Sequence, residues 1–470
     1  MKKFQRFIAF ALTLVLFSLT LCSCSNTGKS IMDKTYSRYD NVASDASYIT
    51  QDGKTKNSFS LKGKNEENKY ITVDLGDSVN YNTVVLGETT KTVTLFEIYG
   101  SNEQDANYEF LYQSDCIEGG HTCYLGDVSY RYLRVFVNGS SGKYNVNSFA
   151  AYDIKKDNAD SLRVNAYLVA ENIKDDMDVS MLDSLTDIIV FGTAKYDAKG
   201  NIIFVDNEGN QVDEKYYSDK IDILRDKIGD RSINLICDIA MPYGENNADI
   251  ISMMNDDNVD NLVSSIKAFV EKYDFDGYDM DYEFPNSKSE WKAFNNFLRK
   301  VDAALPDKII SLALAPWDLK FDDDVIALID RAEIMLYDMF TAHNYHSIFS
   351  TTVNGINKAL NYGFKAEQLD LGVPFYSRPT DRRGYWGNYN QFDVKDKYTN
   401  LYLFNDFDHD GNPMTAFQYL NSYQMICDKT AFALDADLGG LMIWHMSCDL
   451  PYDSEYSLFR AIQETKTAKQ

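Results

Sequence analysis

The acidic residues that could do chemistry in this chain are concentrated in residues 274–285, which read DFDGYDMDYEFP. Asp279, Asp281 and Glu283 alternate there with an apolar and an aromatic residue. Because side chains alternate across a strand, the three acids share one face, with consecutive members about 6–7 Å apart. Closely spaced carboxylates do not all ionise at neutral pH, so one of them keeps its proton. A proton donor beside a carboxylate is the arrangement that cleaves glycosidic bonds.

Two helical patterns bracket this acidic segment. Apolar residues recur at spacings of three and four in residues 259–273 and again in residues 291–305. Ser287 and Glu290 have the spacing of a capping box at the start of the second helix. A strand between two helices is typical of a parallel βαβ unit. This context favours a central strand over the alternative, an edge strand with one solvated acidic face.

Further apolar runs alternate with helical patterns between residues 160 and 465. With the acidic strand included, the runs are RVNAYLV, TDIIVFG, INLICDIAM, GYDMDYE, IISLALAP, AEIMLYD, LDLGVPFY and GGLMIWHM. Eight buried strands in about 300 residues predict an α/β fold, the (β/α)₈ TIM barrel. The active sites of such barrels lie at the carboxyl ends of the strands, where the acidic row ends.

The spacing of the acids resembles the signature of glycoside hydrolase family 18, the chitinases and endo-β-N-acetylglucosaminidases. The family pattern Asp-x-x-Asp-x-Asp-x-Glu falls on Asp276, Asp279, Asp281 and Glu283, with Gly277 also in register. The resemblance implies that Glu283 is the general acid, that Asp281 orients the substrate's acetamido group, and that Asp279 shares a proton with Asp281. Asp276 and Gly277 would shape the strand. The substrate's own acetamido oxygen would attack the anomeric carbon, which retains configuration and needs no metal or cofactor.

Three later strand ends resemble further motifs of the same family. MLYD at residues 335–338 resembles Met-x-Tyr-Asp, which implies that Tyr337 bonds the acetamido group and that Met335 and Asp338 help to bind substrate. LGVPFYSR resembles Leu-Gly-x-Pro-x-Tyr-Gly-Arg, and GGLMIW resembles Gly-Gly-x-Met-x-Trp. These two motifs add the remaining expected substrate-binding residues, Tyr376, Arg378 and Trp444. Trp444 would be the floor beneath the −1 sugar, and ordinary core packing is the alternative.

The third strand departs from the family. Residues 237–244 read CDIAMPYG where the family usually has Ser-x-Gly-Gly, which changes the pocket wall beside the acids. The preferred substrate therefore stays open between chitin oligomers and the chitobiose core of N-glycans. A peptidoglycan glucosaminidase and a non-catalytic surface lectin are the alternatives. Inactive relatives commonly lose the acid, and Glu283 is present.

Residues 40–155 have the pattern of a separate all-β unit, so the chain is expected to be multidomain. KYITVDLGD alternates apolar and polar residues, and TVTLFEIYG and YRYLRVFVNG follow it between turn residues. A β-sandwich is the expected fold. The order of VDLG, FEIYGSN and RYLRV resembles discoidin-like (coagulation factor type C, galactose-binding-like) modules, which include carbohydrate-binding members. The resemblance implies the fold and identifies no ligand residue.

The first 23 residues have the charged and apolar regions of a secretory signal peptide. LCSC at residues 21–24 resembles a bacterial lipobox, with Cys24 as the lipidated residue; an ordinary cleaved signal is the alternative. The resemblance implies an exported protein held by a lipid anchor on the outer side of the bacterial cell membrane. Residues 24–39 are polar and are expected to form a tether.

The composition excludes some partners. A net charge of −25 without a basic run beyond the N-terminus argues against nucleic acid. Cys116 and Cys123 flank a Gly-Gly turn that permits a disulfide. No Cys/His spacing predicts zinc. Residues 406–411 mimic the start of a calcium loop, but Phe417 occupies the position of its glutamate, so a solvated turn is expected.

Overall fold

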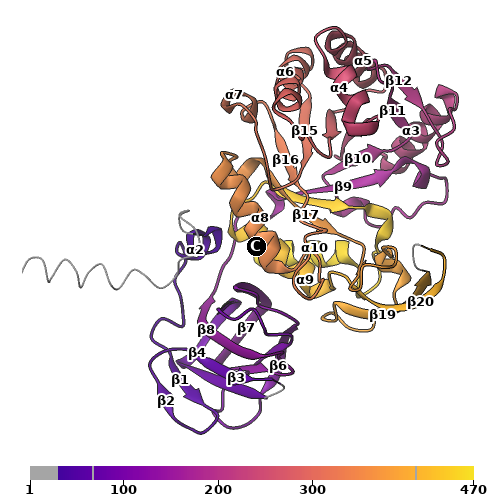
Figure 1. The fold of residues 1–470 in the computed structure, drawn as a ribbon. Helices are drawn as coiled ribbons and strands as arrows, with labels where there is room; N and C mark the ends of the chain where they lie inside the picture. Colours follow the sequence, from indigo (N-terminus) through magenta and orange to yellow (C-terminus); the bar gives the residue numbers. More distant parts are fainter. Residues whose placement is uncertain (1–29, 66–67, 408–409) are drawn as a thin grey trace, which may run out of the picture.

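The computed structural model describes residues 30–65, 68–407 and 410–470. They form an antiparallel β unit and a larger barrel unit that lie side by side (Figure 1). Cys24 and the expected signal peptide lie outside the described residues. Within the described ranges, the helices all fall short of the length and apolar content that a membrane span needs.

The β unit is one antiparallel sheet of eight strands. They are β1 (Ser47–Thr50), β2 (Thr55–Lys56), β3 (Leu61–Lys64), β4 (Lys69–Glu88), β5 (Phe96–Ser101), β6 (Glu109–Ser114), β7 (Gly120–Val137) and β8 (Lys143–Tyr152). The order is β2-β1-β4-β7-β5-β6, and β8 pairs with both β3 and β4. The long strands β4 and β7 pair with two register shifts, which bend the ribbon around an apolar core. The all-β pattern of the sequence is therefore confirmed.

The barrel unit is a closed parallel barrel, as the sequence predicts. Its strands are β9 (Arg163–Val169), β10 (Asp187–Phe191), β13 (Asn234–Asp238), β14 (Gly277–Asp281), β15 (Ile309–Leu314), β16 (Arg331–Ile334), β17 (Leu369–Pro374) and β21 (Gly440–Trp444). Each of these strands pairs with the next barrel strand in chain order, and β21 pairs with β9 to close the barrel. The surrounding helices are α3 (Glu214–Ile228), α4 (Ala248–Met254), α5 (Val259–Lys272), α6 (Lys288–Ala304), α7 (Asp323–Ile326), α8 (Phe349–Tyr362), α9 (Tyr423–Asp435) and α10 (Leu458–Lys469).

Local sequence explains why β14 is set between α5 and α6. Both helices bury the apolar faces that the sequence predicts. The Ser287 hydroxyl caps α6 by accepting from the Glu290 N–H at 3.2 Å. A Cβ at Gly277 would lie 2.7 Å from the Ile309 carbonyl oxygen, so only glycine lets β14 pair closely with β15 at this point.

Residues 30–39, expected to end a polar tether, contain the helix α2 (Ile31–Tyr36). Ile31 and Tyr36 are buried, and they attach α2 to both units. The Ile31 N–H donates to the Asn357 side chain on α8 at 3.1 Å, and the Tyr36 hydroxyl donates to Thr122 on β7 at 3.0 Å. These apolar and hydrogen-bonding contacts order the segment, so the tether prediction is wrong for this part.

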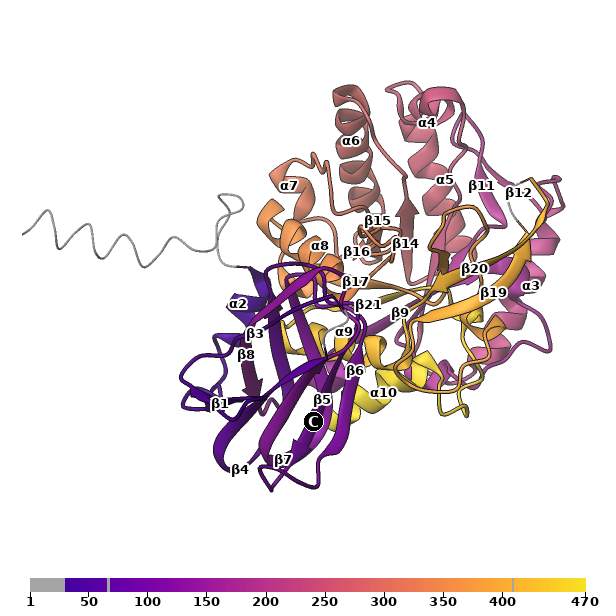
Figure 2. The same ribbon diagram turned by 60° about the horizontal axis from the view of Figure 1, so that its bottom comes forward.

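Buried polar contacts join the two units. α8, α9 and α10 lie on the side of the barrel that faces the β unit (Figures 1 and 2). Asp428 on α9 accepts from the Tyr112 hydroxyl at 2.7 Å and from the Tyr124 N–H at 2.8 Å. Lys469 and Asp435 form a fully buried ion pair of 2.8 Å beside this contact. The barrel therefore supplies hydrogen-bond partners that the β unit alone would lack.

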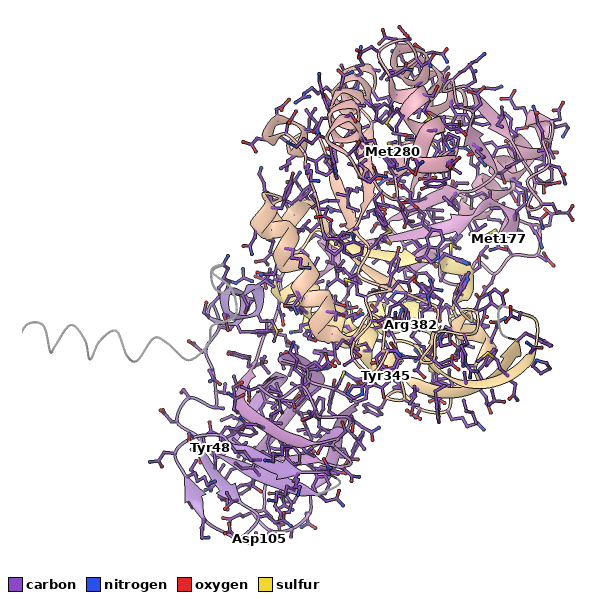
Figure 3. The ribbon with its side chains drawn as sticks, viewed as in Figure 1. Tyr48, Asp105, Met177, Met280, Tyr345 and Arg382 are labelled. Atoms are coloured by element: carbon purple, nitrogen blue, oxygen red, sulfur yellow. The ribbon has the colours of Figure 1, made fainter. Side chains whose placement is uncertain are left out.

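Smaller antiparallel pieces decorate the barrel. β11 (Ala194–Tyr196) pairs with β12 (Ile202–Phe204). A second small sheet comes from the part of the chain between β17 and α9 and contains β18 (Arg378–Pro379), β19 (Leu401–Phe407) and β20 (Pro413–Tyr419). Tyr345 stacks on Tyr419 with ring centroids 4.4 Å apart, on the side toward the β unit (Figure 3). Cys116 and Cys123 are buried and unbonded, so the disulfide that their spacing permits is absent.

Candidate active site

The strand β14 carries the acidic row from the barrel interior to its carboxyl end. Asp279 is completely buried, Asp281 is the last residue of β14, and Glu283 follows two positions later. Glu283 is solvent-exposed at the side of a cavity of about 520 Å³, which Asp281 also lines. The row therefore runs from a dry interior to a space that admits a ligand.

Asp281 and Glu283 form a hydrogen-bonded pair of carboxyls with raised pKa values. Burial raises the pKa of Asp281 well above its ordinary value, and repulsion from Glu283 and Asp279 adds to the rise. Burial also raises the pKa of Glu283, while the hydrogen bond from Asp281 opposes that rise. Among the described residues, no lysine or arginine forms an ion pair with either carboxyl. Without an ion pair to either carboxyl, the pair is more stable with one carboxyl protonated.

Asp279 is surrounded by hydrogen-bond donors. Its Oδ1 accepts from the Ser311 hydroxyl at 2.6 Å, and its Oδ2 accepts from the Tyr167 hydroxyl at 2.6 Å. The carboxyl of Asp238, the last residue of β13, is also in hydrogen-bond contact with it. Burial raises the pKa of Asp279, and these hydrogen bonds oppose the rise.

Asp338 is the one acid of the cleft that has a cation beside it. Arg378 donates to it through Nε at 2.7 Å and also through a terminal nitrogen, and the Tyr376 hydroxyl donates at 3.0 Å. The buried His346 places Nδ1 3.5 Å from the same carboxylate. Burial would raise the pKa of Asp338, but the hydrogen bonds from His346 and Arg378 hold it well below its ordinary value. Asp338 is thus a fixed anion in the same cavity as Glu283, and its charge adds to the rise in the pKa of Glu283.

Aromatic side chains form the walls of the cleft. The lining residues are Asp281, Glu283, Phe284, Ala315, Trp317, Met335, Tyr337, Asp338, Tyr376, Arg378, Trp386 and Trp444. Trp317 is 44% exposed and Trp386 is 40% exposed, so both offer ring faces to a ligand. Trp444 ends β21 and packs with Tyr167 at a centroid distance of 5.2 Å. Aromatic faces with polar edges are suited to sugar rings.

The residues expected from the sequence therefore occupy two places. Glu283, Asp281 and the six residues expected to bind the substrate or its acetamido group line one cavity, and Asp279 lies directly beneath it. Asp276 lies at the opposite end of β14, where its Oδ2 accepts from the Leu235 N–H at 2.8 Å. That bond fixes the start of the strand. Gly277 allows the close strand contact described above.

The segment that departs from the family pattern lies against the acids. Tyr243, which follows β13, is 54% exposed. Its hydroxyl donates to the Asp281 carbonyl at 3.4 Å and accepts from the Glu283 N–H at 3.3 Å. Tyr243 thus braces the backbone between the two catalytic candidates.

Sequence reasoning missed several residues that the fold brings to the site. They are Tyr167, Asp238, Tyr243, Ser311, Trp317, Glu333, His346 and Trp386. Two of them could have been found from the sequence. Asp238 and Glu333 are acids inside otherwise apolar strand runs, and burying an acid is costly unless it has a partner or a function. Nothing in the sequence indicated the loop residues Trp317 and Trp386, because a tryptophan outside a motif is equally compatible with a place in the hydrophobic core.

The family model for "Glycosyl hydrolases family 18" matches residues 150–449. Among curated proteins, the chain is similar to Chitinase A1 from Niallia circulans, with 28% identity over an alignment that covers 40% of this chain and 37% of that protein. The chain thus spans little more than a third of the length of that relative.

Two solved structures show the same fold at low identity. One is the chitinase ChiB from the chitin utilization locus of Flavobacterium johnsoniae, with 21% identity, a TM-score of 0.52, and coverage of 67% of this chain and 94% of that one. The other is a chitinase from Bacteroides thetaiotaomicron, with 18% identity, a TM-score of 0.51, and coverage of 65% and 97%.

Proposed function

Because the chain belongs to glycosyl hydrolases family 18, we propose that it hydrolyses β-1,4 linkages next to N-acetylglucosamine by substrate-assisted, retaining catalysis. The observation that carries the proposal is that Asp281 and Glu283 line one cavity together with aromatic rings, and that burial raises the pKa of both carboxyls. Chitin oligomers and the chitobiose core of N-glycans are the substrates of this class. The likeness to Chitinase A1 supports chitin oligomers as the first to test.

In this mechanism Glu283 donates a proton to the glycosidic oxygen and later accepts one from water. The acetamido oxygen of the substrate attacks the anomeric carbon, and holding it in place replaces a bimolecular step with an intramolecular one. Asp281 turns from Glu283 to the acetamide N–H and stabilises the positive charge of the cyclic intermediate. Tyr337 bonds the acetamido oxygen from the other side of the cavity.

Asp338 and Trp444 support this reaction in different ways. The fixed negative charge of Asp338 repels a negative charge on Glu283, which favours the protonated form of the acid. Trp444 lines the cavity, and its role in the proposed mechanism is the floor on which the sugar ring stacks. Tyr376 and Arg378 hold Asp338 in place, so their contribution to binding comes through that carboxylate.

Release of products from defined glycans tests the proposal. Wild type and Glu283→Gln are incubated with chitin oligomers, N-glycoproteins and peptidoglycan, and the products are identified by mass spectrometry. Loss of the general acid should lower the rate by about 10²-fold or more. Glu271→Gln, a change of an exposed glutamate on α5, is the matched control. Equal rates in wild type and E283Q would remove Glu283 from that role, and glycan binding without any product would favour the lectin alternative.

We also propose that the β unit is a discoidin-like glycan-binding module and that the mature protein is anchored at the membrane through Cys24. A pocket of about 480 Å³ in the β unit supports the first part; Tyr70, Thr50 and Lys62 are among its lining residues. Several acyl chains would give stable attachment. Replacing Cys24 by Ala should move the protein from the membrane to the medium, and unchanged fractionation would contradict the anchor.

A further inference from the structure

Two buried acids beside the catalytic row have no part in the mechanism above. Glu333 lies on β16 with no exposed surface, and Asp238 at the end of β13 is 1% exposed. The nearest arginines are used elsewhere, because Arg331 pairs with Asp187 and Arg163 pairs with Asp370. In the described part of the chain, neither Glu333 nor Asp238 forms an ion pair. A buried carboxyl in that position must carry a proton or receive several hydrogen bonds.

The Tyr167 hydroxyl shows where one proton lies. It is 2.6 Å from Asp279 Oδ2 and 2.9 Å from Glu333 Oε2, although a tyrosine has only one proton to donate. Of the two carboxyls, one must therefore donate to the Tyr167 oxygen. Ser311 already donates to the other oxygen of Asp279, whereas Asn165 Nδ2 donates to Glu333 Oε1 at 2.9 Å and leaves Oε2 as the position for a proton.

The groups around Glu333 agree with this assignment. It faces Asp279 on β14, Asp370 on β17, Tyr167 on β9 and Arg331 on its own strand. Burial raises the pKa of Glu333 well above its ordinary value, repulsion from the two aspartates raises it further, and Tyr167 and Arg331 oppose the rise. The two arginines in this part of the barrel, Arg331 and Arg163, are paired with Asp187 and Asp370.

Asp238 holds a second proton for the same reason. Both of its oxygens are buried without a hydrogen-bond donor of ordinary geometry, and its carboxyl contacts that of Asp279. Two ionised carboxylates in contact would repel each other in a dry site. Asp279 already accepts from Ser311 and Tyr167, so the shared proton belongs to Asp238.

We propose that Glu333 and Asp238 are positioning residues held as neutral acids, which keep Asp279 ionised by donating to it, Asp238 directly and Glu333 through the Tyr167 hydroxyl. This inference rests on the proposed function of the same site. An anion fixed beneath Asp281 favours a proton on the Asp281–Glu283 pair, and that proton stays on Glu283 when Asp281 turns as a carboxylate to the acetamide N–H. The two acids thus act on the reaction through Asp279 and touch no substrate.

Infrared difference spectra at neutral pH test the protonation states directly. A glutamine at position 333 offers the same donor and acceptor pair as a neutral glutamic acid, so Glu333→Gln should fold with its hydrogen bonds intact. It should lose one carbonyl-stretch component of a protonated carboxylic acid relative to wild type. Asp238→Asn should lose another. Equal protonated-acid intensity in wild type and in either variant would overturn the assignment for that residue.

Kinetics test the positioning role. Glu333→Leu leaves the Tyr167 hydroxyl without a donor, and kcat should fall about tenfold with KM little changed. E333Q should recover most of that loss. In a Tyr167→Phe background the difference between E333Q and E333L should disappear, because Glu333 acts only through the hydroxyl. Equal losses in E333Q and E333L with Tyr167 present would overturn the proposal.

These measurements separate the inference from the proposed function. The infrared result does not depend on which glycan is cleaved or on any activity, and it needs only the folded E333Q and D238N proteins. Activity that survives in E283Q would contradict the general acid while leaving the infrared bands unaffected. If E333L fails to fold, the infrared comparison of wild type with E333Q still decides the protonation state.

Discussion

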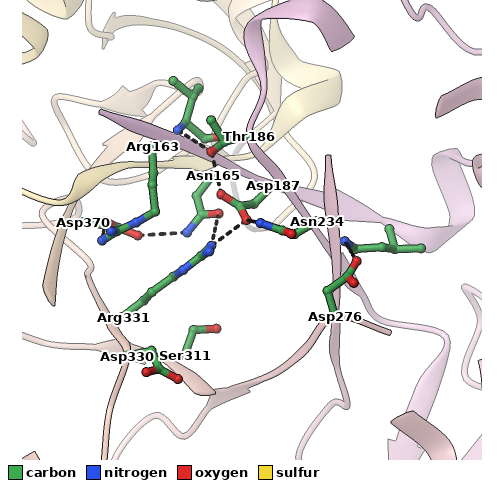
Figure 4. Close-up of polar contacts among 12 residues, drawn as sticks. Arg163, Asn165, Thr186, Asp187, Asn234, Asp276, Ser311, Asp330, Arg331 and Asp370 are labelled. Atoms are coloured by element: carbon green, nitrogen blue, oxygen red, sulfur yellow. Dashed lines mark hydrogen bonds and ion pairs between the residues drawn. The ribbon is translucent and has the colours of Figure 1, made fainter. Parts of the chain in front are cut away.

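The two ends of the barrel hold buried carboxyls in opposite surroundings. At the amino ends of the strands, Asp187 pairs with Arg331 at 2.7 Å and Asp370 pairs with Arg163 at 2.7 Å (Figure 4). At the carboxyl ends, Asp281 contacts another carboxyl, and no described lysine or arginine forms an ion pair with it. Asp338 at the cleft pairs with Arg378, but the buried acids of the catalytic row differ from those of the amino ends in lacking a paired cation.

This difference separates stability from chemistry. An ionised carboxylate in a dry interior is costly unless it is paired, and the arginine end satisfies that requirement. At the acidic end, buried carboxyls avoid the cost of an unpaired charge by staying protonated. A proton held beside a cavity is available for transfer. Asn165 lies between the two ends, because its Nδ2 donates both to Glu333 and to Asp370 at 2.9 Å.

The largest effect is expected at the arginine end. Asp187→Asn leaves Arg331 buried without its carboxylate, and the free energy of unfolding should fall by about 3–5 kcal/mol. In wild type, the side chains of Thr186 and Asn234 donate hydrogen bonds to the Asp187 carboxylate. In the variant they would meet the side-chain amide of the new asparagine instead. Urea unfolding followed by fluorescence measures the loss. The kcat of the protein that remains folded should change little, because Asp187 lies at the far end of the strands from the cavity.

The same substitution at the acidic end should give the opposite result. Asp281→Asn removes the group that turns to the acetamide, so kcat should fall by about 10²-fold. Its free energy of unfolding should not fall, since a buried acid without a cation is replaced by a neutral amide of the same shape. Rates on a chitin oligomer and urea unfolding are measured side by side with D187N. A D281N protein that is less stable than D187N would break the comparison.

The sequence predicted the acidic end better than the arginine end. The alternation of Asp279, Asp281 and Glu283 is local, so a period of two was enough to place them on one face. Arg331 and Asp187 are far apart in the chain, and in the sequence each resembles an ordinary charged residue at the start of a strand. Their pairing depends on closure of the barrel, which brings β16 and β10 residues into one layer.

The cleft walls and the start of the chain show the same limit. Trp317 and Trp386 come from loops whose conformations follow no strand or helix period, so nothing in their spacing placed them in the cavity. Helix α2 is ordered by contacts to α8 and β7. In the sequence, the contacting residues lie 326 positions away on α8 and 86 positions away on β7. Local polarity alone therefore predicted a tether, and tertiary packing decided otherwise.

The smallest effect is expected in the pH dependence of stability, and Asp238 is the residue that reports it. Burial raises the pKa of folded Asp238 well above its ordinary value, whereas the unfolded chain titrates near pH 4. Between that pH and the folded pKa, the native state holds a proton that the unfolded state has released. The free energy of unfolding must therefore fall as pH rises through this window.

Asp238→Asn removes that dependence, because an amide does not titrate. Relative to wild type, the variant should gain on the order of 1 kcal/mol in unfolding free energy for each pH unit between about pH 5 and about pH 7. Urea unfolding at a series of pH values measures the gain, and Asp230→Asn, at an exposed aspartate, controls for the loss of one acidic residue. A difference between D238N and wild type that shrinks as pH rises would mean that native Asp238 is ionised. The acidic end would then be paired after all, and the contrast between the two ends of the barrel would be lost.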